Sequence, residues 1–378
     1  MKRLELLEEL VRQNSYTRNK LGVNKLGEII KNELDFMQCD TYTHPERGDL
    51  IVFNSQETNT SYPKIVLSGH LDTVHSEESE MYYKVEGDKI WGQGIHDMKA
   101  GLFVIINVLK MLYKNGALIN VSCIFTPDEE LQSVAYREQL DKLFTMHDIG
   151  LVYEPTMQIS GTTSFSEDVR SIVVARKGQG RYRFRVTGPG GHSGVITQRN
   201  ARSNAIEEAA HTIVDLEKLS DYDKGTTVNV GHITGGTSFN VIAEECIFEG
   251  DYRVVTKEEH ERLQKEIYNM THIKRIDGVK KEFSFLTLKP PMEEQGASDH
   301  KAILHTVANE MNITLHEEHR GGASDANEMA YSGLTVFDGM GVQGEGEHTQ
   351  QEFVYIDSID QSIDFSYNTI TKLQKTHE

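Results

Sequence analysis

Several short apolar runs in the first half of the chain end in residues that can bind metal ions or move protons. The stretch Lys64–Val74 reads KIVLSGHLDTV, in which the apolar run Ile65–Leu67 leads to His70 and Asp72. An apolar run bounded by glycine is typical of a buried strand, and two residues that lie two positions apart point to the same side. A single histidine after a strand is more often a loop residue than a metal ligand. Whether His70 is a ligand therefore depends on which residues stand at the ends of the other strands.

Two further apolar runs end in carboxylates. Asn120–Thr126 is followed closely by the adjacent Glu129 and Glu130, and Ile149–Tyr153 is followed by Glu154. Adjacent carboxylates repel each other, which makes them uncommon in a plain loop, although a solvated acidic turn is the alternative. Alternating strands and helices predict a mostly parallel sheet whose strands share one carboxyl edge. We expect these side chains to converge at that edge.

Two more candidates stand at the start of a helix and near the end of the chain. Asp97 precedes Ala100–Tyr113, which is apolar nearly all round and predicts a buried helix; the alternative role of Asp97 is a helix cap. His348 follows a glycine-rich stretch. Imidazoles and carboxylates without a thiolate suit two divalent cations such as zinc, cobalt or manganese, and a carboxylate can bridge such a pair. The candidate ligands are His70, Asp97, Glu130, Glu154 and His348, which leaves Glu129 as the candidate general base.

Composition narrows the class of protein. A chain of 378 residues suggests two domains, with three as the alternative, and the net charge of -19 argues against a nucleic-acid partner or an anionic membrane surface. The cysteines Cys39, Cys123 and Cys246 are odd in number and far apart, which favours a reducing compartment. The first residues lack the apolar region of a signal peptide, and no stretch has the length of a membrane span. We therefore expect a cytoplasmic protein.

The pattern of the sequence changes near residue 177. Arg181–Val186 (RYRFRV) alternates strictly, which is typical of a half-exposed antiparallel strand. The order β-α-β-β-α-β that follows predicts a ferredoxin-like α+β domain at 177–289. Residues 1–176 and 290–378 would then form one interrupted α/β domain, with a mixed, mostly parallel sheet flanked by helices. The later elements of the insert are expected at 199–219, Thr227–Thr234, Glu245–Val255, 257–270 and 282–288.

Nine short motifs, in a fixed order between residues 66 and 349, make the sequence resemble a known family. They are SGHLDTV, GIHDMKAGL, TPDEE, YEPT, GGHSG, GGTSFNVI, GDYR, GGASDAN and GEGEHT. The sequence resembles the co-catalytic zinc peptidase and deacylase family that includes glutamate carboxypeptidase, acetylornithine deacetylase, succinyl-diaminopimelate desuccinylase, aminoacylase and peptidase T. The glycine-rich motifs near the end are most similar to the glutamate carboxypeptidase branch.

The resemblance implies a zinc exopeptidase-like catalytic domain with two zinc ions per subunit. It implies that Asp97 bridges both ions, that the peptide bond after it is cis, and that Glu129 is the general base and acid. Asp72 would orient the ring of His70. The remaining ligands would divide between the two ions, with His70 and Glu154 at one, and Glu130 and His348 at the other.

The resemblance also gives the insert a role as a lid and dimerisation domain. His192 would reach the active site of the partner subunit and stabilise the oxyanion, although its position alone suggests plain surface. Arg253 would bind a substrate carboxylate, although a salt bridge with Asp251 or Glu249 is the alternative. The other residues implied to bind substrate are Asn240, Gly322, Ala323 and Ser324. No role is assigned to His75 or His96, and the bulk of His96 departs from the family pattern.

The function implied is a dinuclear zinc hydrolase that cleaves an amide bond next to a free carboxylate. The first hypothesis is a carboxypeptidase or dipeptidase that releases an acidic C-terminal residue from a small peptide. The second is an N-acyl-amino-acid deacylase, of the acetylornithine or succinyl-diaminopimelate type. A metal-binding or carboxylate-binding module without turnover is a remote third. The expected assembly is a homodimer formed through the lid domain.

Overall fold

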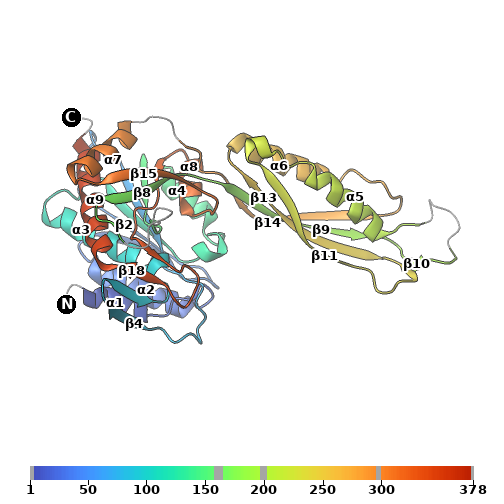
Figure 1. The fold of residues 1–378 in the computed structure, drawn as a ribbon, viewed down its shortest axis with the longest axis horizontal. Helices are drawn as coiled ribbons and strands as arrows, with labels where there is room; N and C mark the ends of the chain where they lie inside the picture. Colours follow the sequence, from blue (N-terminus) through green and yellow to red (C-terminus); the bar gives the residue numbers. More distant parts are fainter. Residues whose placement is uncertain (1–3, 157–164, 196–201, 295–298, 376–378) are drawn as a thin grey trace. The chain divides into compact units, whose positions relative to one another are not determined.

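The computed structural model describes residues 4–156, 165–195, 202–294 and 299–375 (Figure 1). The chain divides into two compact units. Unit 1 comprises Met1–Ala175, Glu294–Arg320 and Ser324–Glu378, and unit 2 comprises Arg176–Glu293 and Gly321–Ala323. Within the described ranges, no helix is both long and apolar enough to cross a membrane.

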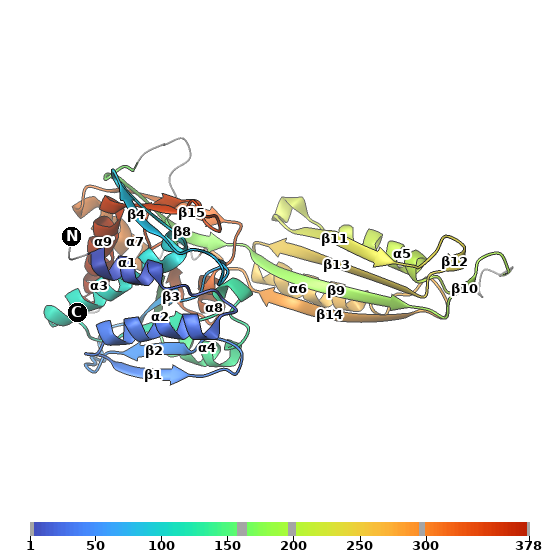
Figure 2. The same cartoon turned by 90° about the horizontal axis from the view of Figure 1, so that it is seen from below.

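A six-stranded sheet forms the centre of unit 1. Strand β3 pairs in parallel with β6 and β7, and β7 pairs in parallel with β16. Strands β2 and β1, which lie side by side in Figure 2, extend the other edge in antiparallel pairs. This confirms the predicted mixed, mostly parallel sheet. In spatial order the strands are β1 (Gln38–Tyr42), β2 (Leu50–Asn54), β6 (Val121–Thr126), β3 (Ile65–His70), β7 (Ile149–Val152) and β16 (Thr335–Phe337).

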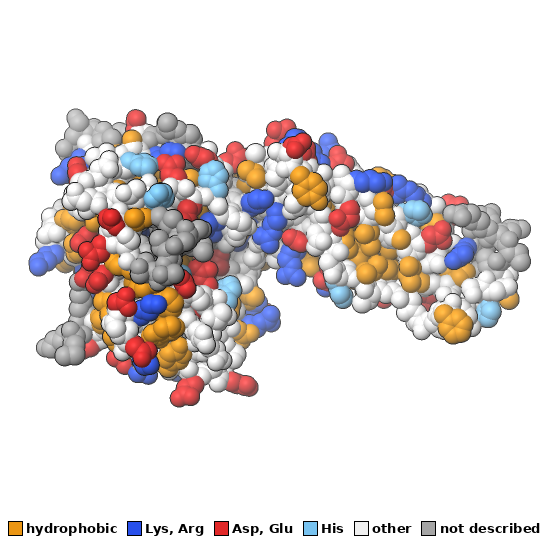
Figure 3. All heavy atoms as spheres, viewed as in Figure 1, with side chains coloured by type: hydrophobic (Ala, Val, Ile, Leu, Met, Phe, Trp, Pro, Cys, Tyr) orange, Lys and Arg blue, Asp and Glu red, His pale blue; other side chains and the backbone are white. Residues whose placement is uncertain are grey.

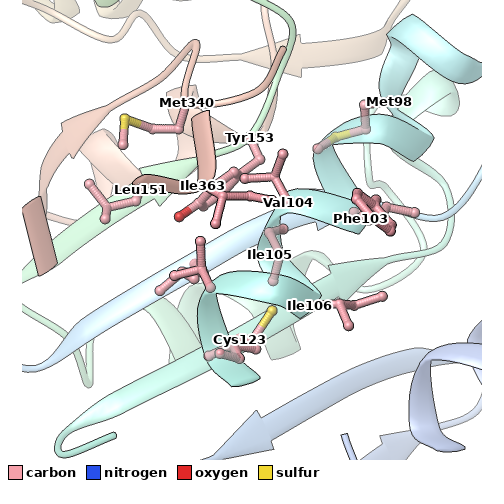
Figure 4. Close-up of a cluster of buried hydrophobic side chains, with 14 of the residues drawn as sticks. Met98, Phe103, Val104, Ile105, Ile106, Cys123, Leu151, Tyr153, Met340 and Ile363 are labelled. Carbon is pink, nitrogen blue, oxygen red and sulfur yellow. The ribbon is translucent and has the colours of Figure 1, made fainter. Parts of the chain in front are cut away.

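Helices pack on both faces of this sheet, because its central strands are apolar on both sides. On one face, Ile105 of α3, Cys123 of β6 and Leu151 of β7 belong to one buried cluster (Figure 4). On the other, a side chain at Gly150 would meet Met329 of α8 at 3.0 Å. The helices of unit 1 are α1 (Glu5–Arg12), α2 (Lys20–Glu33), α3 (Ala100–Lys114), α4 (Arg137–Phe144), α7 (Asp299–Glu310), α8 (Asp325–Tyr331) and α9 (Ile356–Gln374).

Two glycines allow α3 to approach the sheet closely. A Cβ atom at Gly101 would lie 2.3 Å from the backbone oxygen of Tyr153, and one at Gly69 would lie 2.8 Å from the Met98 side chain. At Gly101 the neighbour is a backbone atom that cannot move aside, so only glycine fits there. The start of α3 is therefore held against the carboxyl ends of β3 and β7, which places the preceding Asp97 at that edge.

Smaller sheets complete unit 1. Strand β18 pairs with both β5 and β17, so the end of the chain returns beside the segment that precedes Asp97. The strands are β4 (Tyr83–Glu86), β5 (Lys89–Gly92), β17 (Gly344–Glu345) and β18 (Phe353–Tyr355), and a separate pair joins β8 (Val169–Arg176) and β15 (Thr314–Arg320).

Apart from the two-residue strands β10 and β12, unit 2 has the element order β-α-β-β-α-β that the sequence predicts. Its antiparallel sheet has the order β11-β13-β9-β14, and Tyr182, Phe184 and Val186 of β9 are buried while the arginines between them are exposed. On the face drawn in Figure 3, described Lys and Arg side chains lie among Asp and Glu side chains. The elements are β9 (Gly178–Thr187), β10 (Gly191–His192), α5 (Ala205–Glu217), β11 (Thr227–Gly235), β12 (Val241–Ile242), β13 (Glu245–Val254), α6 (Lys257–Asn269) and β14 (Lys280–Lys289).

Candidate metal centre

The parallel strands of unit 1 bring the candidate ligands to one edge. His70 is the last residue of β3 and pairs in register with Thr126, the last residue of β6. Glu130 follows β6 and Glu154 follows β7, so all three strands deliver a polar side chain at their carboxyl ends. Asp97 lies in the irregular turn Ile95–Lys99 before α3, and the peptide bond from Asp97 to Met98 is cis, as the family resemblance implies.

Asp97 is the centre of the cluster. Its Oδ1 lies 2.9 Å from Nε2 of His70, and its Oδ2 lies 3.1 Å from Nε2 of His348. The two oxygens of one carboxylate therefore face two different imidazoles. Glu130 Oε2 lies 3.3 Å from the same nitrogen of His348, and Glu154 Oε1 lies 3.9 Å from that of His70. The five predicted ligands form one connected group, and Asp97 is not the N-terminal cap of α3, which is Lys99.

Asp72 has two kinds of contact. Its backbone oxygen lies 2.8 Å from Nδ1 of His70, whereas its carboxylate lies 3.5 Å from that atom. The carboxylate accepts hydrogen bonds from the backbone N–H groups of Glu129, at 3.0 Å, and Glu130, at 3.1 Å. Asp72 therefore contacts the His70 ring chiefly through its backbone, and its carboxylate fixes the turn that carries the candidate base and the adjacent ligand.

The raised pKa values of four side chains in this cluster show that it binds protons, and so positive charge, more strongly than the same groups do in water. Burial raises the pKa of Glu154 well above its usual range, and it also raises that of Glu130. Hydrogen bonds to Asp97 and Glu130 raise the pKa of His348 to about 11. Burial alone would lower the pKa of His70, but the nearby carboxylates of Asp72 and Asp97 raise it well above its usual range. Carboxylates crowded in a buried site resist ionisation unless a cation is close.

These residues fit divalent cations. One oxygen each of Asp97 and Glu130 and one nitrogen of His70 all lie within 4.8 Å of one another. Oε1 of Glu130 is buried and has no hydrogen-bond partner among the described residues. A buried carboxylate oxygen without a donor is costly unless a cation binds it. Nitrogen and oxygen donors without sulfur are compatible with zinc, cobalt or manganese.

His192, Asn240 and Arg253, which are predicted to contact substrate, lie in unit 2, whereas the candidate ligands lie in unit 1. His192 of β10 pairs with Val241, so this exposed histidine is a neighbour of Asn240, whose backbone oxygen accepts from Ser193. The guanidinium of Arg253 contacts Asp251 at 3.3 Å, as the alternative interpretation suggested.

The glycine-rich motif after β15 is divided between the two units. Gly322 accepts a hydrogen bond through its backbone oxygen from Arg176, and Ala323 follows it in unit 2. Ser324 belongs to unit 1, is buried and caps α8, and its hydroxyl donates to Asp338 at 2.8 Å. The hydroxyl of Ser324 is therefore already engaged within the fold.

The sequence analysis gave no role to two buried residues behind the cluster. The carboxylate of Glu352 accepts from the backbone N–H of Asp97 at 3.4 Å, and His75 lies beside Glu352. The sequence carries one signal for Glu352, which is its position four residues after His348. It carries no spacing rule that singles out His75.

The fold and this cluster define a hydrolase of the metal-dependent class. Residues 66–372 match Peptidase family M20/M25/M40, and the chain belongs to that family. Its members among known proteins are metal-dependent peptidases and related amide hydrolases, so the protein is a metallohydrolase.

Two curated relatives match nearly the whole chain. The chain is 26% identical over 367 residues to carboxypeptidase G2 of Pseudomonas sp. (strain RS-16). This alignment covers 94% of the chain and 85% of carboxypeptidase G2. It is 25% identical over 381 residues to succinyl-diaminopimelate desuccinylase of Psychrobacter sp. (strain PRwf-1). That alignment covers 94% of the chain and 92% of the desuccinylase.

Two solved structures share the fold. The aminopeptidase PepT of Bacillus cereus superposes with a TM-score of 0.78 at 19% identity, and covers 99% of this chain and 98% of its own. The YXEP protein of Bacillus subtilis, a dinuclear metal-binding peptidase, superposes with a TM-score of 0.70 at 16% identity with the same coverage. These likenesses confirm the fold class.

Proposed function

We propose that the protein is a dinuclear zinc hydrolase that cleaves an amide bond next to a free carboxylate, as a carboxypeptidase or dipeptidase. The observation that carries this proposal is the Asp97 carboxylate, whose two oxygens face the imidazoles of His70 and His348 at 2.9 and 3.1 Å. A carboxylate with two separate nitrogen neighbours suits a bridge between two metal ions.

The ligands would divide around that bridge. His70 and Glu154, which lie 3.9 Å apart, would hold one ion, and Glu130 and His348, which lie 3.3 Å apart, would hold the other. Bound divalent cations would supply Lewis acidity, which activates water and polarises the scissile carbonyl. Cobalt or manganese would be possible substitutes for zinc.

Glu129 would carry the proton. It is adjacent to the ligand Glu130, and its backbone is fixed by Asp72 at 3.0 Å. A base beside the cluster takes the proton of the attacking water and passes it to the leaving amine, so that the amide C–N bond breaks with a neutral leaving group. Asp72 would hold that base at a constant position relative to His70.

Unit 2 would act as the lid and dimerisation domain. Arg253 would bind the substrate carboxylate, because its guanidinium is partly exposed and matches the geometry of a carboxylate. His192, with Asn240 beside it, would complete the active site of the partner subunit and stabilise the oxyanion. The backbone at Gly322, Ala323 and Ser324 would line the substrate pocket.

A hydrolysis panel tests the reaction. The panel contains dipeptides, C-terminal glutamate conjugates, N-acetyl amino acids and N-succinyl amino acids, each with zinc, with cobalt and with a chelator. We expect turnover of the dipeptides or glutamate conjugates that the chelator abolishes and zinc restores. Turnover of the N-acyl amino acids alone would favour the second candidate, a deacylase, which the similarity to the desuccinylase supports. No turnover by protein with two bound metal ions would contradict both.

Mixed dimers test the role of His192. A His192→Ala subunit and a Glu129→Ala subunit should each be inactive alone, but a mixture should regain activity, because one hybrid site contains both groups. Subunit exchange is verified with two affinity tags. Lack of recovery in exchanged dimers, or a monomer in solution at every concentration, would contradict a role for His192 across the dimer.

A further inference from the structure

His75 and Glu352 form a buried pair in unit 1. Their side chains are 6% and 1% exposed, and Nε2 of His75 lies 2.7 Å from Oε1 of Glu352. The two side chains therefore share a hydrogen bond between the imidazole and the carboxylate. The distance is typical of a strong hydrogen bond to a charged acceptor.

The second oxygen of Glu352 faces the bridging residue of the candidate centre. Oε2 accepts from the backbone N–H of His96 at 3.1 Å and from that of Asp97 at 3.4 Å. Both oxygens of this carboxylate are therefore used. One side of Glu352 restrains the backbone of Asp97, and the other side contacts His75.

The pair connects three segments that carry candidate ligands. His75 lies five residues after His70 in the chain, and Glu352 lies four residues after His348. The backbone oxygen of Glu352 also accepts from the N–H of Gly92 at 3.0 Å, in the segment that leads to Asp97. The end of β3, the turn before α3 and the His348 loop thus meet at one buried carboxylate.

A buried carboxylate near Asp97 needs a reason, since like charges in a region of low dielectric destabilise each other. The donors from His75 and the two backbone N–H groups compensate for the loss of hydration of Glu352. A fully satisfied buried network is rigid, and rigidity is useful where the positions of several ligands must be fixed together.

We propose that His75 and Glu352 are positioning residues, which fix the backbone of Asp97 relative to the His70 and His348 segments so that the two metal ions bind with high affinity. This inference rests on the dinuclear centre proposed above. Neither side chain is required to touch substrate, so their substitution should change metal affinity and kcat far more than KM.

Zinc affinity measured by competition with a chromophoric chelator tests this proposal without reference to any substrate. His75→Ala should weaken the binding of at least one zinc ion by roughly ten- to a hundredfold, the range known for residues that support ligands. It should also alter the visible absorption bands of the cobalt-loaded protein. His75→Gln places an amide N–H near the position of Nε2, and it should recover most of the wild-type affinity.

His305→Ala is the matched control. Its Nε2 lies 2.8 Å from Glu317 in an exposed pair of the same unit, and its loss should leave zinc affinity unchanged. If His75→Ala binds two zinc ions with wild-type affinity and an unaltered cobalt spectrum, the pair has only a structural role and the proposal is wrong, even where the melting temperature falls. If His75→Ala does not fold, the zinc affinity and the cobalt spectrum of Glu352→Gln test the proposal in its place. Wild-type protein that binds no zinc would instead contradict the proposed metal centre itself.

Discussion

The carboxylate of Asp72 accepts a hydrogen bond from the backbone N–H of Glu129 over 3.0 Å. Asp72 follows the end of β3, and Glu129 follows the end of the neighbouring strand β6. The contact is fully buried on the Asp72 side. The parallel pairing of these two strands therefore places the candidate base at a defined position beside the ligand at the end of β3.

Asp72→Asn should lower kcat by roughly ten- to a hundredfold while metal ions remain bound, because an amide retains only one of the two acceptor oxygens. The carboxylate accepts from both Glu129 and Glu130, so the turn would lose one of its two hydrogen bonds. Steady-state kinetics and metal analysis of the purified variant measure the two effects.

Asp148→Asn is the control for that variant. Its carboxylate also accepts from a backbone N–H, that of Lys64, but before the opposite end of β3, at 2.8 Å. Its kcat should equal that of the wild type. Equal losses in both variants would show that the Asp72 contact acts only on the stability of the sheet.

The adjacent residues Glu129 and Glu130 should have separable effects. Glu129→Gln should reduce kcat by roughly a hundred- to ten-thousandfold and leave two metal ions bound, as expected for loss of a general base. Glu130→Gln should lose metal, because Glu130 contacts His348 at 3.3 Å and has a buried oxygen for which the described part of the chain supplies no donor. Kinetics and metal content of the two purified variants, compared side by side, test the division of roles. Metal loss in Glu129→Gln would contradict it.

Asp97 and His348 should differ in the number of metal ions that depend on them. Asp97 faces both imidazoles, whereas His348 faces only one side of the cluster. Asp97→Ala should therefore bind almost no zinc, and His348→Ala should retain about one ion per subunit, as expected for a bridged pair. Elemental analysis after gel filtration gives the stoichiometry. Retention of two ions by Asp97→Ala would exclude the bridge.

The strand ends were predictable from the sequence because each joins an apolar run to a metal-binding side chain. His70 ends the buried strand β3, Glu130 and Glu154 follow the buried strands β6 and β7, and a parallel sheet necessarily brings such ends together. The alternation in Arg181–Val186 likewise predicted a half-exposed strand, which β9 confirms. These features depend on local patterns, and local patterns are what a single sequence contains.

Other features depend on tertiary contacts and were missed. Strand β1 (Gln38–Tyr42, QCDTY) is exposed along its whole length, and its sequence has no run of apolar residues that would predict a strand. It forms a strand because it pairs with β2. The contacts of the Asp72 carboxylate follow from the register between β3 and β6. Glu352 reaches Asp97 because β18 pairs with β5, a contact between segments more than 250 residues apart.

Acid should destabilise unit 2 through His260. This histidine of α6 is 3% exposed, and burial lowers its pKa to about 4. In the unfolded chain its pKa is about 6.5. Between these values the unfolded state binds a proton that the folded state does not, so stability is unaffected above about pH 6.5 and falls as the pH decreases toward 4. The loss of unfolding free energy amounts to at most about 3 to 4 kcal/mol.

His260→Asn should reduce this loss, because the amide does not titrate but can still contact the hydroxyl of Tyr252, which lies 3.2 Å from Nδ1. Urea unfolding at pH 7 and pH 4.5, followed by hydrogen exchange of peptides from β13, measures the stability of unit 2 at each pH. The variant should start less stable at pH 7, because Asn fills less volume, and should lose less on acidification. His232→Asn, at an exposed site on β11, is the control and should behave as the wild type. An equal loss in His260→Asn and the wild type would exclude His260 as the cause, since it would show that the proton is bound elsewhere.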